Sequence, residues 1–456
     1  MTTLPILYEI FLESSGVSTD TRQVNQNELF FALKGGNFDG NKFANQALEK
    51  GASYVVVDDA TIIPSFDEHD PNKLAYKNKY LLVENVLESL QKLANFHRKQ
   101  FTIPFIGITG SNGKTTTKEL VRSVLSQKFK TYATEGNLNN HIGVPLTILR
   151  MPKHTEIAII EMGANKVGDI AELCSIAEPT YGMITNIGNA HLEGFGGYEG
   201  VLRGKTELYL SLIKNNGTVF INSNDSVLMN MEKRFETGKV IKYGTLDTEN
   251  SIENYYSATL SKSVPVIIYK DEENNEVQTQ LTGAYNFPNI LAALAFGKFF
   301  GLSTSQMNKG IAEYLPKNNR SQVEERTETK NTLLLDAYNA NPDSMKAALL
   351  HLEAMPKNGK QKIAILADMF ELGKESFIKH KEILGLALQL KVDKIIVCGK
   401  DFQKAKMTGN IVSSLILSFA DKKELADYLE QNPIKESIIL LKGSRGMGLE
   451  TVVELL

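Results

Sequence analysis

The sequence predicts an α/β protein of three domains: a mixed α/β N-terminal domain, a central parallel-sheet P-loop domain and a C-terminal Rossmann-like α/β domain. Length is the first indication, because 456 residues correspond to about three domains at roughly 100–200 residues each. Composition is the second, since 42% hydrophobic and 23% charged residues are typical of a folded soluble protein. The third is the alternation of short apolar runs with helical patterns, which is typical of parallel sheets with helical crossovers.

Two breaks in the helical pattern predict the domain boundaries. The first follows a helical repeat over Asn85–Lys99, after which Phe101–Pro104 reads as a linker. The second lies in Tyr314–Arg320, where Pro316 follows a short helix capped by Ser303. The predicted segments are 1–100, 101–314 and 315–456.

Apolar runs predict the strands of the two larger segments. Those of the central segment are Phe105–Thr109, Ile157–Met162, Met183–Ile187 and Thr218–Asn222. Those of the third segment are Thr332–Leu335, Lys362–Ala367, Lys394–Val397 and Ile438–Leu441. Helical spacing between them, as at Leu120, Val121, Val124 and Leu125, supplies the crossovers of a parallel sheet.

Charge and targeting features exclude several classes of partner. The formal net charge is −3, from 50 basic and 53 acidic residues, so no strong basic field attracts nucleic acid or an anionic membrane. No run of 18 apolar residues predicts a spanning helix, and no basic residue precedes Arg22 as a signal peptide requires. Cys174 and Cys398 lie far apart without metal-ligand spacing and are expected to be buried. A cytoplasmic monomer without membrane insertion is expected.

A phosphate-binding loop follows the strand Phe105–Thr109. Its glycines allow backbone N–H groups to close on phosphate oxygens, and the helix that follows adds the positive end of its dipole. Lys114 is placed to reach the terminal phosphates, and the Thr115 hydroxyl can bind Mg²⁺. The residues expected to contact nucleotide here are Gly110, Asn112, Gly113, Lys114, Thr115 and Thr116.

The loop departs from the usual pattern at its first glycine, whose place Ile108 takes. The variant TGSNGKTT resembles that of the Mur ligase family, whose ATP-dependent members form the amide bonds of the peptidoglycan stem peptide. Three further motifs resemble the family in the same order, at Asn137–Pro145, Glu161–Ala164 and Asn186–Glu193. The resemblance extends through all three segments and implies a role in cell-wall synthesis, hence in cell shape and division.

Three residues are candidates for the metal site. Glu161 ends an apolar strand and presents an oxygen at the sheet edge where α/β ligands bind, which suits Mg²⁺. The resemblance implies that His191 is a second ligand, although Mg²⁺ does not ordinarily prefer imidazole. It also implies that Lys205 carries a carbamate, which would replace a repelling ammonium by a carboxylate-like ligand. With Thr115, these residues would serve two Mg²⁺ ions. The expected catalytic residues are Lys114, Lys205 and His191.

A glycine-rich stretch after His191 does not indicate a dinucleotide site. Glycines stand at Gly194, Gly196 and Gly200, but no strand leads into Gly194 and the G-x-G-x-x-G spacing fails at Glu199. Nicotinamide and flavin cofactors are therefore not expected.

The rest of the ATP site is predicted from the resemblance. It implies that Asn289 hydrogen-bonds the adenine, which an amide can do as donor and acceptor. Asn286, three residues earlier, is alternatively a helix cap. Arg320 and Asp336 resemble family residues that reach phosphate and ribose. Both lie in the third segment, so domain closure would complete the site.

The third segment carries the most discriminating motif, Asp336–Ser344. It resembles the family member that adds the last two residues of the stem peptide, as do Asp368–Gly373 and Lys442–Gly446. Arg445 or Lys442 is expected to pair with the terminal carboxylate of the acceptor dipeptide. The acceptor-site residues implied by the resemblance are Tyr338, Asn339, Asn341, Asp368, Lys442 and Arg445.

The first segment resembles the family's site for the UDP-sugar precursor. The matching stretches are Ser18–Arg22, Leu29–Gly35 and Asp39–Gly40, whose hydroxyl groups and arginine suit a uridine diphosphate. Taken alone, Asp20 and Arg22 are more often a surface ion pair. The precursor-site residues implied here and in the central segment are Thr19, Asp20, Thr21, Arg22, Asn139 and Asn140.

The resemblance implies a specific reaction. ATP phosphorylates the free carboxylate of UDP-N-acetylmuramoyl-tripeptide, and the amine of D-alanyl-D-alanine attacks the acyl phosphate to give amide, ADP and phosphate. The alternatives are a related ligase with another acceptor, such as a folylpolyglutamate synthetase or a third-residue ligase, and a noncatalytic ATP-binding switch. The third residue of the tripeptide, lysine or diaminopimelate, and the group that deprotonates the amine remain open.

Overall fold

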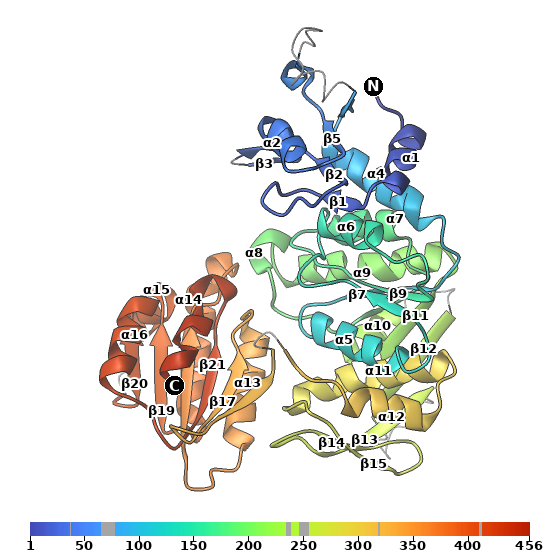
Figure 1. Ribbon diagram of the computed structural model, residues 1–456. Helices are drawn as coiled ribbons and strands as arrows, with labels where there is room; N and C mark the ends of the chain where they lie inside the picture. The colour runs from blue at the N-terminus through green and yellow to red at the C-terminus, as the bar shows by residue number, and fades with distance from the viewer. Residues whose placement is uncertain (37, 65–77, 234–238, 246–254, 318–319, 410–412) are drawn as a thin grey trace. The chain divides into compact units, whose positions relative to one another are not determined.

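The computed structural model covers residues 1–456 (Figure 1) and describes all of them except 37, 65–77, 234–238, 246–254, 318–319 and 410–412. The chain divides into two compact units. Unit 1 comprises Met1–Gly107, Lys130–Gly163 and Asp169–Tyr181, and unit 2 comprises Ile108–Phe129, Ala164–Gly168 and Gly182–Leu456. The predicted boundaries of 1–100, 101–314 and 315–456 stay a prediction, because a two-way division does not test them.

The N-terminal part of unit 1 is a small parallel α/β sheet. Its strands, in spatial order, are β1 (Gly16–Ser18), β2 (Glu28–Phe31), β5 (Tyr54–Val57) and β6 (Tyr80–Leu82). Its other elements are α1 (Leu4–Glu13), the hairpin β3 (Lys34–Gly35) and β4 (Phe38–Asp39), α2 (Ala44–Glu49) and α4 (Val86–Arg98). The predicted start of α4 is confirmed, because the Asn85 side chain accepts a hydrogen bond from the Glu88 N–H at 2.9 Å.

The remainder of unit 1 comes from the central segment. It consists of the parallel pair β8 (Thr131–Ala133) and β9 (Ile157–Glu161) with helices α6 (Gly143–Leu149) and α7 (Asp169–Ala177). Every residue of β9 is buried, which explains why its sequence is a continuous apolar run and not an alternation. Glu161 therefore stands at the carboxyl end of a buried strand, as predicted.

Strands of the central segment form a nine-stranded sheet in the order β15-β14-β13-β12-β11-β10-β7-β9-β8. Strands β7 (Phe105–Thr109) and β10 (Tyr181–Ile184) contribute residues to both units. The others are β11 (Thr218–Asn222), β12 (Lys239–Thr245), β13 (Tyr256–Lys262), β14 (Ile268–Lys270) and β15 (Glu276–Gln278). β11, β12 and β13 run parallel, and β14 and β15 extend the edge antiparallel.

Helices of unit 2 pack along this sheet (Figure 1). They are α5 (Lys114–Leu125), α8 (Leu192–Phe195), α9 (Tyr198–Lys214), α10 (Ser226–Glu232), α11 (Phe287–Phe299) and α12 (Thr304–Ala312). α11 is apolar on all sides and almost wholly buried, as expected of a helix enclosed by other elements. The Phe296 ring of α11 stacks on Phe220 of β11 with centroids 3.9 Å apart. Ser303 caps α12 in a complete capping box, which confirms the predicted start of that helix.

The C-terminal part of unit 2 is a second α/β sheet with strand order β16-β17-β21-β18-β19-β20. Its strands are β16 (Gln322–Arg326), β17 (Asn331–Asp336), β18 (Gln361–Ala367), β19 (Lys394–Cys398), β20 (Ile416–Phe419) and β21 (Ser437–Lys442). Its α-helices are α13 (Pro342–Ala354), α14 (Ser376–Gln389), α15 (Lys400–Thr408) and α16 (Lys422–Gln431). All neighbouring strands are parallel except the edge pair β16 and β17. The predicted parallel α/β fold of the third segment is confirmed.

One predicted strand is displaced. The run Met183–Ile187 was expected to be extended, but β10 is Tyr181–Ile184. The Thr185 N–H still bonds the Thr109 carbonyl at 2.8 Å, and from Asn186 onward the chain bonds to the phosphate loop. No helix within the described ranges has the length and apolar character needed to cross a membrane.

Candidate functional site

The phosphate loop takes the form that its glycines predict. Gly110 and Gly113 both have positive φ, +142° and +79°, at the approach to α5. A Cβ added at Gly110 would lie 2.0 Å from Thr185 Oγ1, and one at Gly113 would lie 2.8 Å from Asn289 Oδ1. Only glycine fits either position, so backbone N–H groups remain accessible at the start of α5.

The loop is held from behind by the segment that follows β10. The Asn112 N–H donates to Asn186 Oδ1 at 3.0 Å, and the Asn186 amide returns a bond of 3.0 Å to the Asn112 carbonyl. Ser111 exchanges hydrogen bonds with the backbone of Gly188. These contacts fix the loop before any ligand binds. Lys114 Nζ lies over the loop, 2.7 Å from the Gly110 carbonyl oxygen.

Asn289, predicted to bind adenine, is buried beneath the loop. Its Oδ1 accepts a bond from the Thr117 hydroxyl at 3.0 Å, and its Nδ2 donates to Asn286 Oδ1 at 3.1 Å. Asn286 in turn donates to the Thr282 carbonyl and makes no side-chain cap of α11. Asn286 is thus the N-cap residue of α11 by position, without the side-chain bond that a capping asparagine usually makes. Protein groups occupy the Asn289 amide in this structure, and its contact with adenine stays a prediction.

Residues of the DAYNANPDS stretch contact the phosphate-loop region of unit 2. Asn341 caps α13 by accepting from the Ser344 N–H at 2.9 Å, and its Nδ2 donates to Asn112 Oδ1 at 2.7 Å. Two residues later, Asp343 accepts a bond of 2.6 Å from the Asn189 N–H. The structure thus brings Asn112 and Asn341, predicted for nucleotide and acceptor, into direct contact.

Two arginines share one aromatic ring. The guanidinium carbon of Arg320 lies 3.5 Å from the ring centroid of Tyr338, and that of Arg445 lies 4.9 Å from it. Stacking of this kind orients a guanidinium and leaves its edge N–H groups available to an anion. The structure therefore brings together one residue predicted for ATP and two predicted for the acceptor.

Lys442 and Asp336 are paired with each other. Lys442 is 1% exposed, and its Nζ lies 2.6 Å from Asp336 Oδ2 and 3.2 Å from the Asn339 carbonyl oxygen. The Asn339 side chain accepts a bond from the following Ala340 N–H at 2.9 Å. Of the two cations expected to meet the acceptor carboxylate, only Arg445 is accessible, because the ammonium of Lys442 is enclosed.

Asp368 has a structural environment. It is 5% exposed and accepts hydrogen bonds from the Asp401 and Phe402 N–H groups at the start of α15, at 3.0 and 2.9 Å. Burial is the main cause of its raised pKa. Both carboxylate oxygens are therefore occupied within the C-terminal sheet, while the Asp368 carbonyl accepts a bond of 3.1 Å from the N–H of Ser444, the residue before Arg445.

His191 meets a carboxylate that sequence reasoning did not select. Its Nδ1 lies 2.5 Å from Glu371 Oε2, and this close approach of His191 is the main reason that the pKa of Glu371 is lowered. Both residues have left-handed backbone conformations, with φ of 56° and 62°. A non-glycine residue in this conformation is uncommon and often marks a functional site. Only the structure shows this conformation, although Glu371 lies within the Asp368–Gly373 motif.

Lys205 is buried in α9 at 1% exposure. Its Nζ lies 3.4 Å from the Ala164 carbonyl oxygen and 5.2 Å from the centroid of the Phe195 ring. No three His, Cys, Asp or Glu side chains gather as a metal cluster in the described part of the chain. The predicted ligands are the Thr115 hydroxyl, the Glu161 carboxylate and the His191 imidazole, and carbamylation of Lys205 would add a further oxygen, the donor that a hard cation prefers. Their assembly into one Mg²⁺ site stays a prediction.

In unit 1, the predicted residues form local pairs. Arg22 and Asp20 make an ion pair of 2.7 Å, whose hydrogen bonds lower the pKa of Asp20 to about 2. Asn139 Nδ2 donates to Glu161 Oε1 at 2.8 Å, and Asn140 Oδ1 accepts from the Gly143 N–H at the start of α6. Thr19 and Thr21 flank Asp20 in the turn that follows β1.

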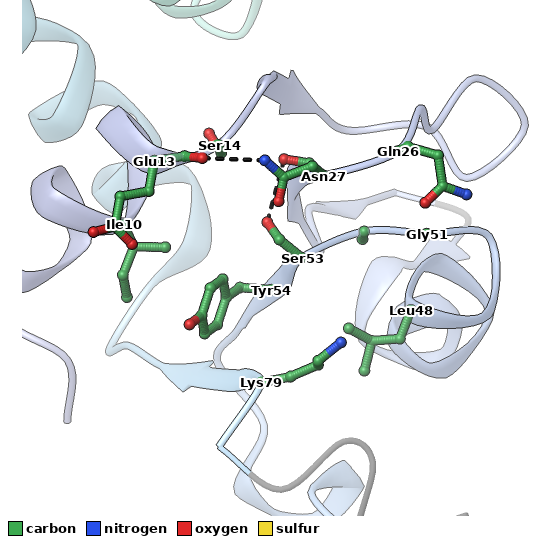
Figure 2. A pocket seen from close by; sticks show the side chains of 11 residues that line it. Ile10, Glu13, Ser14, Gln26, Asn27, Leu48, Gly51, Ser53, Tyr54 and Lys79 are labelled. Atoms are coloured by element: carbon green, nitrogen blue, oxygen red, sulfur yellow. Dashed lines mark hydrogen bonds between the residues drawn. The ribbon is translucent and has the colours of Figure 1, made fainter.

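Figure 2 shows a cavity elsewhere in unit 1, of about 470 Å³. It lies where β5 and β6 begin, with Tyr54 and Lys79 on one side and Glu13 of α1 on the other. None of the described residues that line it was predicted as a site residue. The predicted precursor residues Thr19–Arg22 instead follow β1 at the opposite, carboxyl edge of the same parallel sheet.

Comparison with protein-family models gives three consecutive matches. They are the Mur ligase family catalytic domain at residues 13–98, the Mur ligase middle domain at 108–297 and the Mur ligase glutamate ligase domain at 319–445.

Among curated proteins, UDP-N-acetylmuramoyl-tripeptide–D-alanyl-D-alanine ligase of Bacillus subtilis is 34% identical over 445 residues, covering 96% of this chain and 92% of the relative. The protein of that name from Escherichia coli is 32% identical, covering 96% and 93%. Among solved structures, MurF from Acinetobacter baumannii is similar at a TM-score of 0.84 with 27% identity, covering 99% of this chain and 98% of that one. MurF from Thermotoga maritima in complex with ADP is similar at 0.79 with 27% identity, covering 98% and 97%.

Proposed function

The chain belongs to the Mur ligase family, and from this premise we propose that it joins D-alanyl-D-alanine to the free carboxylate of UDP-N-acetylmuramoyl-tripeptide with conversion of ATP to ADP and phosphate. The observation that carries the proposal is the contact of Asn341 with Asn112, 2.7 Å between their side chains. This contact joins two motifs. One is Asp336–Ser344, which resembles the family member that uses this acceptor, and the other is the phosphate-binding loop before α5. The reaction would be a cytoplasmic step of peptidoglycan synthesis.

Positioning and charge neutralisation suffice for the proposed chemistry. The N–H groups at the start of α5 would hold the phosphates of ATP, and Lys114 would turn from the Gly110 carbonyl toward the transferred phosphoryl group. The tripeptide carboxylate would attack the γ-phosphorus, form an acyl phosphate and release ADP as the leaving group. The dipeptide amine would then attack the acyl carbon, and phosphate would leave. Mg²⁺, when bound, would neutralise phosphate charge through Thr115, Glu161, His191 and carbamylated Lys205.

Burial supports the proposed carbamate on Lys205. The Lys205 side chain is enclosed at 1% exposure beside the Ala164 carbonyl, so a carbamate formed there would be shielded from bulk water. The resulting carbamate would be anionic, and a bound cation would stabilise it. Two Mg²⁺ ions are proposed for the site.

Substrate contacts are proposed for each segment. The turn Thr19–Arg22 would hold the uridine diphosphate, with Asn139 and Asn140 nearer the sugar and peptide. Arg320 would contact ATP, with Asp336 near the ribose. Arg445, which is accessible beside Tyr338, would pair with the carboxylate of the dipeptide. The chain is proposed to act as a monomer, with domains at 1–100, 101–314 and 315–456.

Phosphate release tests the proposal. The enzyme is assayed with ATP, Mg²⁺ and UDP-N-acetylmuramoyl-tripeptide ending in lysine or in diaminopimelate, each with and without D-alanyl-D-alanine. Release is expected only when all substrates are present and with one tripeptide preferred. Release supported equally by glutamate as the acceptor, or ATP binding without any turnover, would contradict it and favour a related ligase or a switch protein.

A further inference from the structure

Ser444 links the two loops of the C-terminal sheet that follow the neighbouring parallel strands β18 and β21. It lies two residues beyond β21 and is 4% exposed. Its N–H donates to the Asp368 carbonyl at 3.1 Å, and its hydroxyl accepts a bond of 2.9 Å from the Phe370 N–H. Because both bonds come from one buried residue, the loop after β21 has a defined position against the loop after β18.

The loop after β18 is itself firmly held. The Asp368 carboxylate accepts hydrogen bonds from two N–H groups at the start of α15, at 3.0 and 2.9 Å. The next residue, Met369, donates its N–H to Nε2 of His380 at 3.0 Å, and His380 is fully buried. The two bonds of Ser444 therefore join the loop after β21 to a support that is fixed independently of any ligand.

Arg445, the residue after Ser444, has a fixed backbone and an exposed side chain. On its carboxyl side, the Met447 N–H donates to the Ser444 carbonyl at 2.9 Å and closes a turn of 3-10 helix. Gly446 lies against the Phe370 ring, because a Cβ added at Gly446 would lie 2.7 Å from Phe370 Cε2. The backbone of Arg445 is therefore held on both sides by contacts that involve Ser444 or the loop after β18.

A guanidinium binds a carboxylate best when it is presented in a fixed direction, because two parallel N–H···O bonds depend on geometry. The Tyr338 ring, whose centroid lies 4.9 Å from the Arg445 guanidinium carbon, restricts the side chain. We propose that Ser444 is a positioning residue that directs Arg445 toward the terminal carboxylate of the acceptor dipeptide. The proposal rests on the proposed function, in which Arg445 pairs with that carboxylate. Without the Ser444 hydroxyl, the loop after β21 would lose one of its two bonds to the loop after β18, and the guanidinium would sample more directions.

Kinetics with two acceptors tests whether Ser444 acts through Arg445. Phosphate release is measured at saturating ATP and UDP-N-acetylmuramoyl-tripeptide, with D-alanyl-D-alanine or its C-terminal amide varied; the amide lacks the anion that Arg445 is proposed to bind. Ser444→Ala is expected to raise KM for the dipeptide by about two- to tenfold, the range that one hydrogen bond carries, with kcat unchanged. The kcat/KM for the amide should stay at the wild-type value.

Ser437→Ala is the matched control. It removes a buried serine hydroxyl, which donates to the Lys435 carbonyl at 2.8 Å, from the opposite end of β21. Its kinetics with both acceptors should match those of the wild type.

A double-mutant cycle gives the second readout. Because the Ser444 hydroxyl is proposed to act only through the guanidinium, Ser444→Ala should have no further effect on the dipeptide once Arg445→Ala is present. Equal losses with the dipeptide and the amide, additive effects in the double variant, or an unchanged KM in Ser444→Ala would overturn the proposal. These results would leave the ligase assignment standing if release by the wild type requires D-alanyl-D-alanine. Release that is independent of this dipeptide would reject the ligase assignment and the role of Ser444 together.

Discussion

Asn341 joins its own helix to the phosphate loop: its Oδ1 caps α13 and its Nδ2 lies 2.7 Å from Asn112 Oδ1. The two functions use different ends of the amide. A substitution that keeps the capping bond and removes the bond to Asn112 therefore separates the two functions. The contact also places the start of α13 at the loop that the sequence predicts to hold phosphate.

Asn341→Ser is expected to retain the cap, since serine is a preferred N-cap residue, but its side chain is too short to reach Asn112. Loss of one hydrogen bond, worth about 0.5–1.5 kcal/mol, should weaken ATP binding by roughly two- to tenfold. Thermal stability should be close to that of the wild type. Asn341→Ala should lose about 1 kcal/mol of stability as well. Calorimetric titration with a nonhydrolysable ATP analogue and thermal unfolding measure the two effects; equal ATP affinity in all three proteins would contradict the interpretation.

Lys114→Ala should remove the charge that stabilises the transferred phosphoryl group. We expect kcat to fall by at least about 100-fold, as for the loss of single electrostatic groups in other enzymes, with the circular dichroism spectrum unchanged. Lys309→Ala is the matched control, because that ammonium is 62% exposed on α12. Its removal should leave kcat unchanged. Phosphate release within tenfold of the wild type would exclude the role of Lys114.

Lys205→Ala should abolish turnover by removing the proposed carbamate. Short carboxylic acids such as acetate should restore part of the activity, because a small anion can enter the space that the side chain leaves and supply the missing oxygen. Lys214→Ala, at the exposed end of the same helix, controls for the loss of a lysine from α9. Absence of rescue combined with a bare ammonium in a crystal grown under CO₂ would count against the modification.

Substitutions of the two arginines beside Tyr338 should affect the KM values of different substrates. Arg320→Ala should raise KM for ATP, and Arg445→Ala should raise KM for D-alanyl-D-alanine, because each guanidinium is proposed to meet a different anion. Tyr338→Leu should raise both values by a smaller factor, since the ring orients both side chains. Steady-state kinetics with each substrate varied in turn measures this. A rise in the same KM from both arginine variants would contradict the division.

His351 predicts a loss of stability in mild acid. It is buried, its Nε2 lies 2.7 Å from Thr282 Oγ1, and burial lowers its pKa to about 4 from an ordinary value of about 6.5. Because the unfolded chain takes up the proton first, the contribution is complete above about pH 6.5 and is lost as the pH falls toward 4. Thermal unfolding of His351→Gln should depend less on pH in this window. His154→Gln, at an exposed position, should behave as the wild type; equal slopes in all three would refute the assignment.

Local patterns predicted the elements whose signals are local. Phe105–Thr109 and Thr218–Asn222 are strands with the predicted bounds, and the phosphate loop has the backbone that its glycines require. The strands Lys239–Thr245 and Glu276–Gln278 were not predicted, because each has few buried residues and includes charged or polar side chains, so neither is a continuous apolar run. The third-segment edge strand Gln322–Arg326 was missed because none of its residues is buried and only Val323 is apolar.

The sequence predicted which residue types belong to the site, but it could not predict which side chains they contact. Lys442 and Arg445 are equally cationic in sequence, yet only the folded sheet shows that Lys442 is enclosed by Asp336 while Arg445 stays accessible. Likewise, only the structure shows that the Asp368 carboxylate accepts hydrogen bonds from N–H groups at the start of α15. These pairings join residues 33 or more positions apart, and nothing in a local pattern specifies them. Glu371 is the opposite case: it was not predicted as a site residue, and only the folded structure places it beside His191.

Both cysteines of the chain are buried, and enclosure raises the pKa of the Cys398 thiol to about 12. A thiol that stays protonated and enclosed reacts slowly with maleimides and other alkylating dyes. Cysteines introduced at exposed positions can therefore be labelled selectively without first replacing Cys174 or Cys398. Fluorophore pairs placed in this way on different segments would report changes in their separation during catalysis, one molecule at a time.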